Sequence, residues 1–122
     1  MLKNFLLVGL GGMIGSMLRY TASVLVKNTT SGFPIATFSV NIIGSFVIGW
    51  VFGMSLKEGS INWDWKLFLT TGICGGFTTF SALSLEGVAL IQQQRYGIFA
   101  TYFIASILAG LAAAWLGLLI SK

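Results

Sequence analysis

The residues best suited to chemistry in this chain form one stretch, residues 72–81, with the sequence GICGGFTTFS. Three glycines and two adjacent β-branched threonines are poor helix formers, and each glycine costs about 1 kcal/mol relative to alanine inside a helix. A helix interrupted in such an apolar segment releases backbone carbonyls, which must be buried in protein or line a polar cavity. A cluster of these carbonyls is a natural cation site. The alternative interpretation is a glycine face packed against a neighbouring helix.

Two rows of uncharged polar side chains recur at intervals of four residues, a spacing that places each row on one helix face. They are Thr37, Asn41 and Ser45 in one row, and Tyr102, Ser106 and Gly110 in the other. Hydroxyl and amide donors suit a small, strongly hydrated anion that must shed water without binding too tightly to leave. The alternative is hydrogen bonding between helices, worth about 0.6 kcal/mol per contact. The rows taken alone favour this alternative.

Two charged residues, Arg19 and Glu86, lie within apolar segments. They are expected toward the same membrane face, opposite the chain termini. Arg19 either extends to the interface or contributes to a positive vestibule, and pairing with Glu86 is geometrically possible. A structural role for both charges is an equal alternative.

The composition excludes most catalytic sites. The chain has no histidine and one cysteine, which rules out an ordinary zinc site, an internal disulfide and a Ser-His or Cys-His pair. Glu58 and Asp64 lie in a polar connection, where a solvated role is expected. A net charge of +4, scattered along the chain, does not indicate a nucleic-acid partner. We therefore expect no enzyme.

The elements that must position these residues are membrane helices. Charged residues make up 8% of the chain, against about 25% in soluble domains, and about 20 apolar residues suffice to cross the bilayer as a helix. The expected spans are 4–26, 34–56, 67–91 and 96–120. Pro34 suits a first helical position, while Trp63 and Trp65 suit interfacial anchors in the connection 57–66. The sequence predicts an all-α membrane protein, with residues 1–122 as one four-helix domain and its third helix broken at mid-membrane.

Positive charges give only a weak bias in orientation. With four spans, the side of the termini carries Lys3, Lys57, Lys66 and Lys122, and the other side carries Lys27 and Arg95, with Arg19 nearby. Insertion in both orientations fits this distribution, as does a weakly biased ordinary protein. Small residues that allow close helix packing recur at Gly11 and Gly15, at Ser45, Gly49 and Gly53, and at Ser106, Gly110 and Ala114. Since four helices bury little among themselves, we expect an oligomer, most simply a dimer.

Three ordered motifs are similar to those of a known family. They are residues 11–15 (GGMIG) followed by Arg19 and Tyr20, residues 37–44 (TFSVNIIG), and residues 72–81. Together they resemble the CrcB/Fluc family of fluoride channels across all four segments.

This resemblance implies a fluoride-selective channel that passively exports fluoride from the cytoplasm and lowers its toxicity. It also implies an antiparallel, dual-topology homodimer with two pores in the inner (plasma) membrane of a bacterium. A structural Na⁺ at the dimer centre would be held by the main-chain carbonyls of Gly75 and Thr78.

The resemblance also assigns the pore. Its lining residues would be Thr37, Asn41, Phe80, Ser81, Tyr102 and Ser106. The edge of an aromatic ring is the positive end of its quadrupole, so an anion can rest against Phe80. Two positions depart from the family pattern: Leu83 replaces a second phenylalanine, and Gly110 replaces a frequent serine. These departures concern the details of the ion path.

Two other functions remain open from the residues alone. One is a small dual-topology, proton-coupled multidrug exporter, although such exporters resemble one another in an essential glutamate in helix one, where this chain has no acid. The other is a noncatalytic membrane subunit, which leaves the mid-membrane glycine and threonine stretch without a role.

Overall fold

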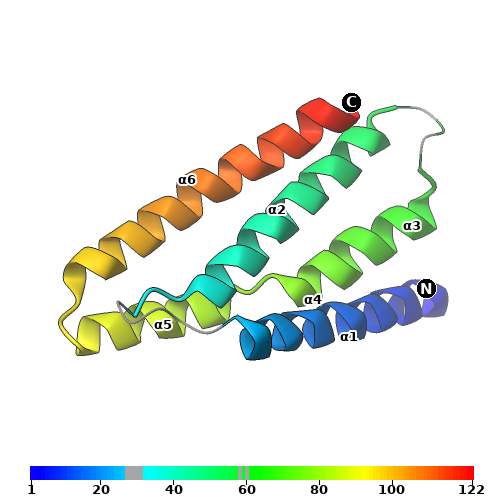
Figure 1. The fold of residues 1–122 in the computed structure, drawn as a ribbon. Coiled ribbons are helices and arrows are strands. Elements are labelled where there is room, and N and C mark those ends of the chain that lie inside the picture. Colours follow the sequence, from blue (N-terminus) through cyan, green and yellow to red (C-terminus); the bar gives the residue numbers. More distant parts are fainter. Residues whose placement is uncertain (27–31, 58, 60) are drawn as a thin grey trace.

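The computed structural model describes residues 1–26, 32–57, 59 and 61–122, so Lys27 and Glu58 of the sequence predictions lie outside it. All regular elements in these ranges are helical. Four spans are long and apolar enough to cross a membrane: α1 (Leu2–Leu25), α2 (Ile35–Ser55), Trp63–Gln92 and α6 (Tyr96–Ser121). Both termini lie at the same end of the molecule (Figure 1). The prediction of an all-helical, four-span chain is confirmed.

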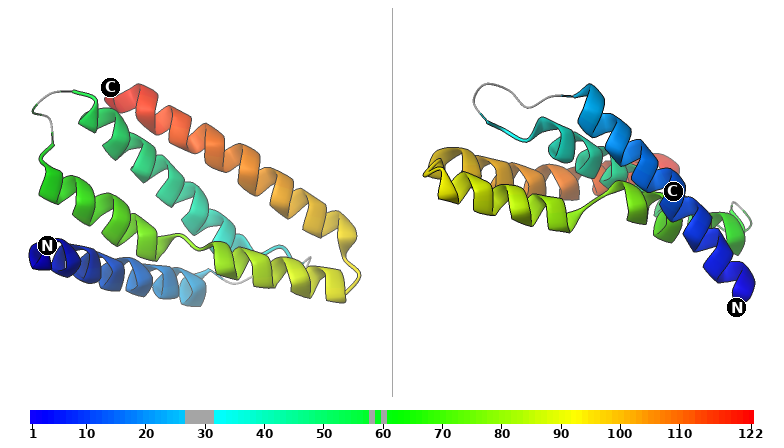
Figure 2. Two further views of the ribbon diagram at one scale, coloured as in Figure 1. Left: turned by 180° about the vertical axis from the view of Figure 1, so that it is seen from behind. Right: turned by 90° about the horizontal axis from the view of Figure 1, so that it is seen from below.

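The third span is interrupted within the predicted stretch. It consists of α3 (Trp63–Leu67), the π-helical η1 (Phe68–Cys74), α4 (Gly75–Phe77) and α5 (Phe80–Gln92). The connecting Thr78 (φ −85°, ψ 158°) and Thr79 (φ −152°, ψ 120°) are extended, and the third span changes course there in Figure 2. The break is therefore confirmed, whereas the π-helical segment before it was not predicted.

Two helix starts differ from the sequence prediction. Pro34 is not the first helical residue; it precedes α2 at the N-cap. Trp63 and Trp65 belong to α3 and not to the preceding connection. The cause is Asn62, whose side-chain oxygen accepts the Trp65 N–H at 2.9 Å and so starts the helix early.

Small residues bring the helices together in two pairs. A Cβ atom at Gly15 would collide with the main-chain oxygen of Ile73, so α1 lies directly against η1. A Cβ atom at Gly49 would likewise collide with the oxygen of Ala114, and α2 packs most extensively against α6. This arrangement confirms the close approach predicted from the small-residue rows.

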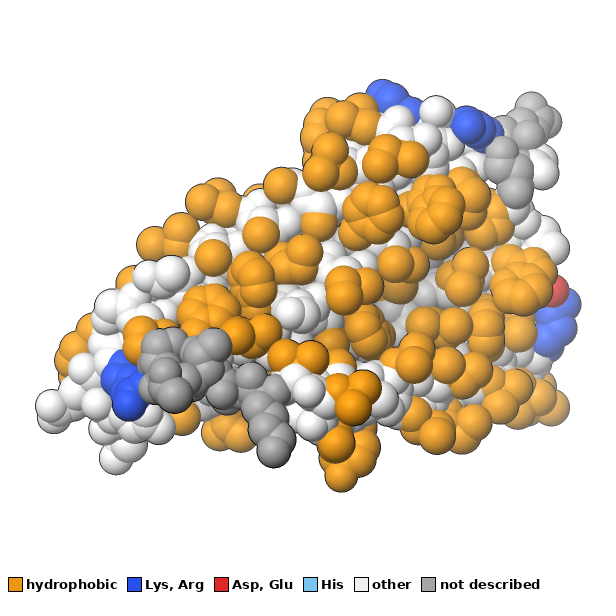
Figure 3. Space-filling view, in the orientation of Figure 1, with side chains coloured by type: hydrophobic (Ala, Val, Ile, Leu, Met, Phe, Trp, Pro, Cys, Tyr) orange, Lys and Arg blue, Asp and Glu red, His pale blue; other side chains and the backbone are white. Residues whose placement is uncertain are grey.

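The outer surface is apolar, as a lipid environment requires. Large side chains such as Phe5, Leu85 and Leu111 are more than two-thirds exposed. Hydrophobic side chains cover the middle of the face in Figure 3, and Lys and Arg lie toward its ends. At the end of the termini, Lys3 Nζ forms an ion pair with Asp64 Oδ2 at 2.9 Å, where both side chains remain partly exposed.

Candidate functional site

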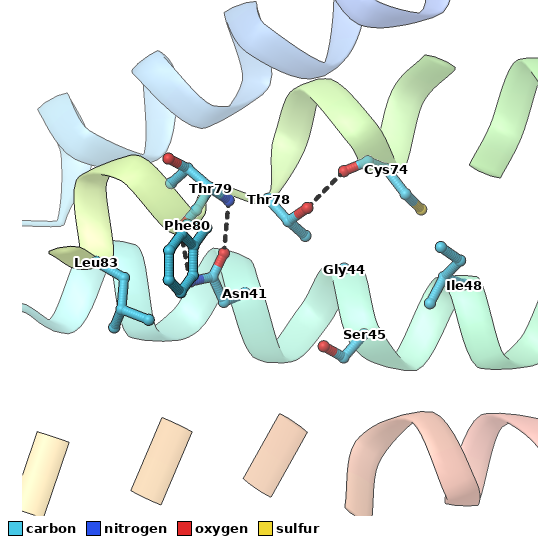
Figure 4. Close-up of a pocket in the computed structure, with 9 residues that line it drawn as sticks. All are labelled: Asn41, Gly44, Ser45, Ile48, Cys74, Thr78, Thr79, Phe80 and Leu83. Atoms are coloured by element: carbon cyan, nitrogen blue, oxygen red, sulfur yellow. Dashed lines mark hydrogen bonds between the residues drawn. The ribbon is translucent and has the colours of Figure 1, made fainter. Parts of the chain in front are cut away.

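The break in the third span is braced from outside by Asn41 on α2. Its Nδ2 donates to the Thr79 oxygen at 3.2 Å, and its Oδ1 accepts the Thr79 N–H at 2.8 Å (Figure 4). In an unbroken helix the Thr79 N–H would bond to the Gly75 oxygen, and the break removes that partner inside the membrane. The Thr79 oxygen belongs to the N-cap residue of α5, whose carbonyl accepts the first bond of that helix. The amide has two N–H donors, so one remains for a further contact. Asn41 therefore combines a structural bond with a polar donor.

The two threonines of the break complete its local structure. Thr79 Oγ1 accepts the Ala82 N–H at 3.0 Å, which makes Thr79 the N-cap of α5. Thr78 Oγ1 donates to the Cys74 oxygen at 2.8 Å. Gly44 of α2 contacts the Thr78 methyl group so closely that a Cβ atom there would overlap it. The threonines and α2 together fix where α4 stops and α5 starts.

A second brace comes from Arg19 on α1. Its Nε donates to the Gly76 oxygen at 3.0 Å, and in a continuous helix this oxygen would accept the N–H of Phe80. The guanidinium also lies near the negative end of the first half of the span, where a positive charge is favourable. Among the described residues Arg19 forms no ion pair with Glu86. The sequence left this pairing open, and the structure shows a backbone bond in its place.

A cavity of about 320 Å³ lies beside the break and is called the break cavity here. Figure 4 shows its lining residues, which are Asn41, Gly44, Ser45, Ile48, Cys74, Thr78, Thr79, Phe80 and Leu83. The Phe80 ring is 77% exposed in the isolated chain. Asn41 and Phe80, both predicted to line the pore, thus share one cavity with Leu83.

A second cavity, of about 430 Å³, also reaches Thr79 and is called the charged cavity here. It is lined by Ser16, Arg19, Tyr20, Ser23, Ala36, Thr37, Val40, Thr79, Ala82 and Glu86. The predicted charges Arg19 and Glu86 thus lie on one cavity. Thr79 lines both cavities, so both reach the break.

Glu86 holds together three helices through its carboxylate. Oε2 accepts the Thr37 hydroxyl at 2.8 Å, and Oε1 accepts the hydroxyl of the fully buried Tyr102 at 2.8 Å. The family resemblance assigned Thr37 and Tyr102 to the pore, whereas their rows alone favoured hydrogen bonds between helices. The structure places both hydroxyl groups on this carboxylate. The sequence reasoning missed the cluster because its members come from three different spans, and no spacing pattern relates them.

The remaining predicted residues lie apart from this cluster. Ser81 is exposed, and its Oγ is 3.2 Å from Thr79 Oγ1. The Ser106 hydroxyl oxygen is buried and has no hydrogen-bond partner among the described residues. Gly110 faces Ser45, because a Cβ atom there would be 3.6 Å from the Ser45 hydroxyl oxygen. The Ser106 hydroxyl is therefore an unsatisfied polar group inside an apolar span.

The carbonyl groups of Gly75 and Thr78 fit the expected cation in their chemistry. The described residues hold no group of three or more His, Cys, Asp or Glu that could hold a metal. Main-chain carbonyls are neutral oxygen ligands of the kind that suits Na⁺. Gly75 is exposed, and a Cβ atom there would meet nothing closer than 3.7 Å. Among the described residues no side chain donates to either oxygen. Unwound carbonyls at the end of a half-helix are typical Na⁺ ligands in membrane proteins.

These features define a class: a four-span membrane protein whose third helix is interrupted beside two cavities that carry polar side chains. A family model described as CrcB-like protein, Camphor Resistance (CrcB), matches residues 6–118, and the chain belongs to this family. It is 46% identical to the fluoride-specific ion channel FluC of Azobacteroides pseudotrichonymphae, over 100% of this chain and 98% of the relative. It is 49% identical to FluC of Methylobacillus flagellatus (92% and 89% covered) and 45% identical to FluC 1 of Listeria monocytogenes (98% of each). The predicted family is confirmed.

Proposed function

We propose that this chain forms a fluoride-selective ion channel that passively releases fluoride from the cytoplasm and so lowers its toxicity. The observation that carries the proposal is 45–49% identity, over nearly the whole chain, to relatives named as fluoride-specific ion channels. In this proposal the protein is a channel and catalyses no reaction, and the ion path consists of hydroxyl and amide groups. The proposed place of action is the inner (plasma) membrane of a bacterium.

The polar groups support anion passage. Asn41 retains one N–H after bracing the break, and the buried Ser106 hydroxyl has no partner among the described residues. Such donors can replace water around fluoride without adding a full positive charge that would hold it. Phe80 adds the positive edge of an aromatic ring beside Asn41. Ser81 completes the proposed lining together with Thr37 and Tyr102, whose hydroxyl groups donate to Glu86 and so are not free donors in this structure.

The functional unit in this proposal is an antiparallel homodimer with two pores. One protomer leaves Phe80 77% exposed and Gly75 exposed as well, so the candidate site lies partly on its surface. A second copy would cover these residues. The weak bias of positive charges allows both orientations in the membrane, as an antiparallel pair requires.

A sodium ion at the dimer centre is the proposed structural cofactor. Carbonyls of Gly75 and Thr78 from both protomers would hold it, and its charge would offset the repulsion of converging carbonyl dipoles. The chain's own contribution is to keep those oxygens available: Thr78 N–H and Oγ1 both bond to Cys74, and Asn41 holds Thr79.

The test is fluoride efflux from vesicles that contain the purified protein alone. Fluoride should leave down its gradient, and a potassium ionophore should speed the efflux because it relieves the build-up of charge. Empty vesicles and chloride-loaded vesicles are the controls. Efflux that requires a proton gradient would favour the exporter, and absence of efflux from an intact protein would favour a subunit of a larger assembly.

A further inference from the structure

We propose that Arg19 is a positioning residue: its bond to the Gly76 carbonyl sets the geometry of the helix break and thereby the direction of the neighbouring carbonyls. The bond itself is a property of the fold. Its consequence for cation binding rests on the proposed function, in which Gly75 and Thr78 hold sodium.

Helix α1 lies close enough to the break to support it. A Cβ atom at Gly76 would be 2.5 Å from the Gly12 oxygen, and one at Gly15 would be 2.8 Å from the Phe77 nitrogen. The backbone of α1 therefore touches η1 and α4 directly. Arg19 lies about one helical turn beyond Gly15, which brings its side chain to the end of α4.

The Gly76 bond leaves one side of the helix end available for a ligand. Successive residues are about 100° apart around a helix axis of 3.6 residues per turn. The Cys74 oxygen is taken by Thr78, and the Gly76 oxygen is held toward α1 by Arg19. The intervening Gly75 then lies away from α1, and it is exposed. The Arg19 bond to Gly76 therefore also fixes the orientation of the neighbouring Gly75 on the side of the helix away from α1.

This role differs from that of a charge that attracts fluoride into the charged cavity. A positioning role depends on the donor atom at Nε, whereas an attracting role depends on the positive charge. Two neutral substitutions separate them, because Gln has its Nε2 as many bonds from Cα as the Nε of Arg, and Met has no donor there. Arg19→Gln and Arg19→Met both remove the charge, but only Arg19→Gln keeps a donor for Gly76.

The first measurement does not depend on transport: amide hydrogen exchange of the segment 75–82 in the purified proteins. A part-buried carbonyl left unpaired costs about 1–3 kcal/mol, which is about five- to 140-fold in a local opening equilibrium. Exchange in this segment should accelerate by that factor in Arg19→Met and much less in Arg19→Gln. Lys3→Gln, which removes a charge at the other end of α1, should leave the segment unchanged.

The second measurement is the sodium concentration that gives half-maximal fluoride efflux. Arg19→Met should need at least about five times more sodium than Arg19→Gln, because it lacks the hydrogen bond to the Gly76 carbonyl, worth at least about 1 kcal/mol. Excess sodium should restore fluoride efflux through Arg19→Met. Equal exchange and equal sodium dependence in the two variants would overturn the proposal, as would failure of both variants to assemble. If the wild-type protein conducts no fluoride, the proposed function fails, and the exchange data still decide the role of Arg19.

Discussion

Replacement of Asn41 tests its two functions, because the structure gives this side chain both a bond and a place on the ion path. Asn41→Asp keeps an acceptor for the Thr79 N–H, but it loses the donor to the Thr79 oxygen and places a carboxylate against that oxygen, so it should lower stability by at least about 1–3 kcal/mol. Asn41→Ala leaves the Thr79 N–H without its partner, which costs about 1–3 kcal/mol. Both variants should therefore be less stable than the wild-type protein.

Fluoride transport should separate the two variants. An aspartate about 4 Å from a passing fluoride repels it by about 4 kcal/mol at an effective dielectric of about 20, which is close to a thousandfold in rate. Alanine adds no charge, so the assembled alanine dimer should conduct better than the aspartate dimer.

The assay pairs thermal unfolding of each purified dimer with fluoride efflux from vesicles at neutral pH. Normal efflux through Asn41→Asp would show that Asn41 is not on the ion path. Unchanged stability of Asn41→Ala would show that its bonds to Thr79 do not support the break. Either result refutes the corresponding half of the reasoning.

Three further substitutions test other parts of the site. Phe80→Ile should sharply reduce fluoride efflux because it removes the aromatic edge in the break cavity, whereas Leu83→Phe should preserve or raise it; an unimpaired Phe80→Ile channel would contradict an aromatic contact. Gly15→Ala should lower thermal stability by about 1–3 kcal/mol through overpacking, while Gly9→Ala, which has open space, should be neutral or stabilising; equal melting temperatures would count against the tight α1 contact. Gly75→Val should disturb the backbone and the dimer and weaken sodium-dependent efflux, and unaltered sodium dependence would argue against a ligand at this position.

The parts of the fold that depend on local sequence could be predicted. Four long apolar segments indicate four spans, because each segment must bury itself in lipid whatever its neighbours are. The break was also readable, since the glycines and threonines of residues 72–81 weaken a helix locally. Its place at Thr78 and Thr79 follows from the same stretch.

The contacts that join different spans could not be predicted. The bonds of Asn41 to Thr79 and of Arg19 to Gly76 link residues 38 and 57 positions apart, and no periodicity relates them. The bonds of Glu86 to Thr37 and Tyr102 could not be predicted either. Thr37 and Tyr102 each belong to a polar row on their own helix, and neither row indicates Glu86 as a partner. Asn62 caps α3 and so starts the third span before the apolar run begins. The sequence prediction placed the start from the apolar run and did not use this capping residue.

The most direct measurement of the central claim is an electrical recording across a bilayer that contains the purified dimer, with unequal fluoride on the two sides. A fluoride-selective channel should carry a current that reverses at the fluoride equilibrium potential. An imposed proton gradient or a chloride gradient should not move that potential. A reversal potential that follows protons or chloride, or no current from a correctly assembled dimer, would contradict passive and selective fluoride conduction.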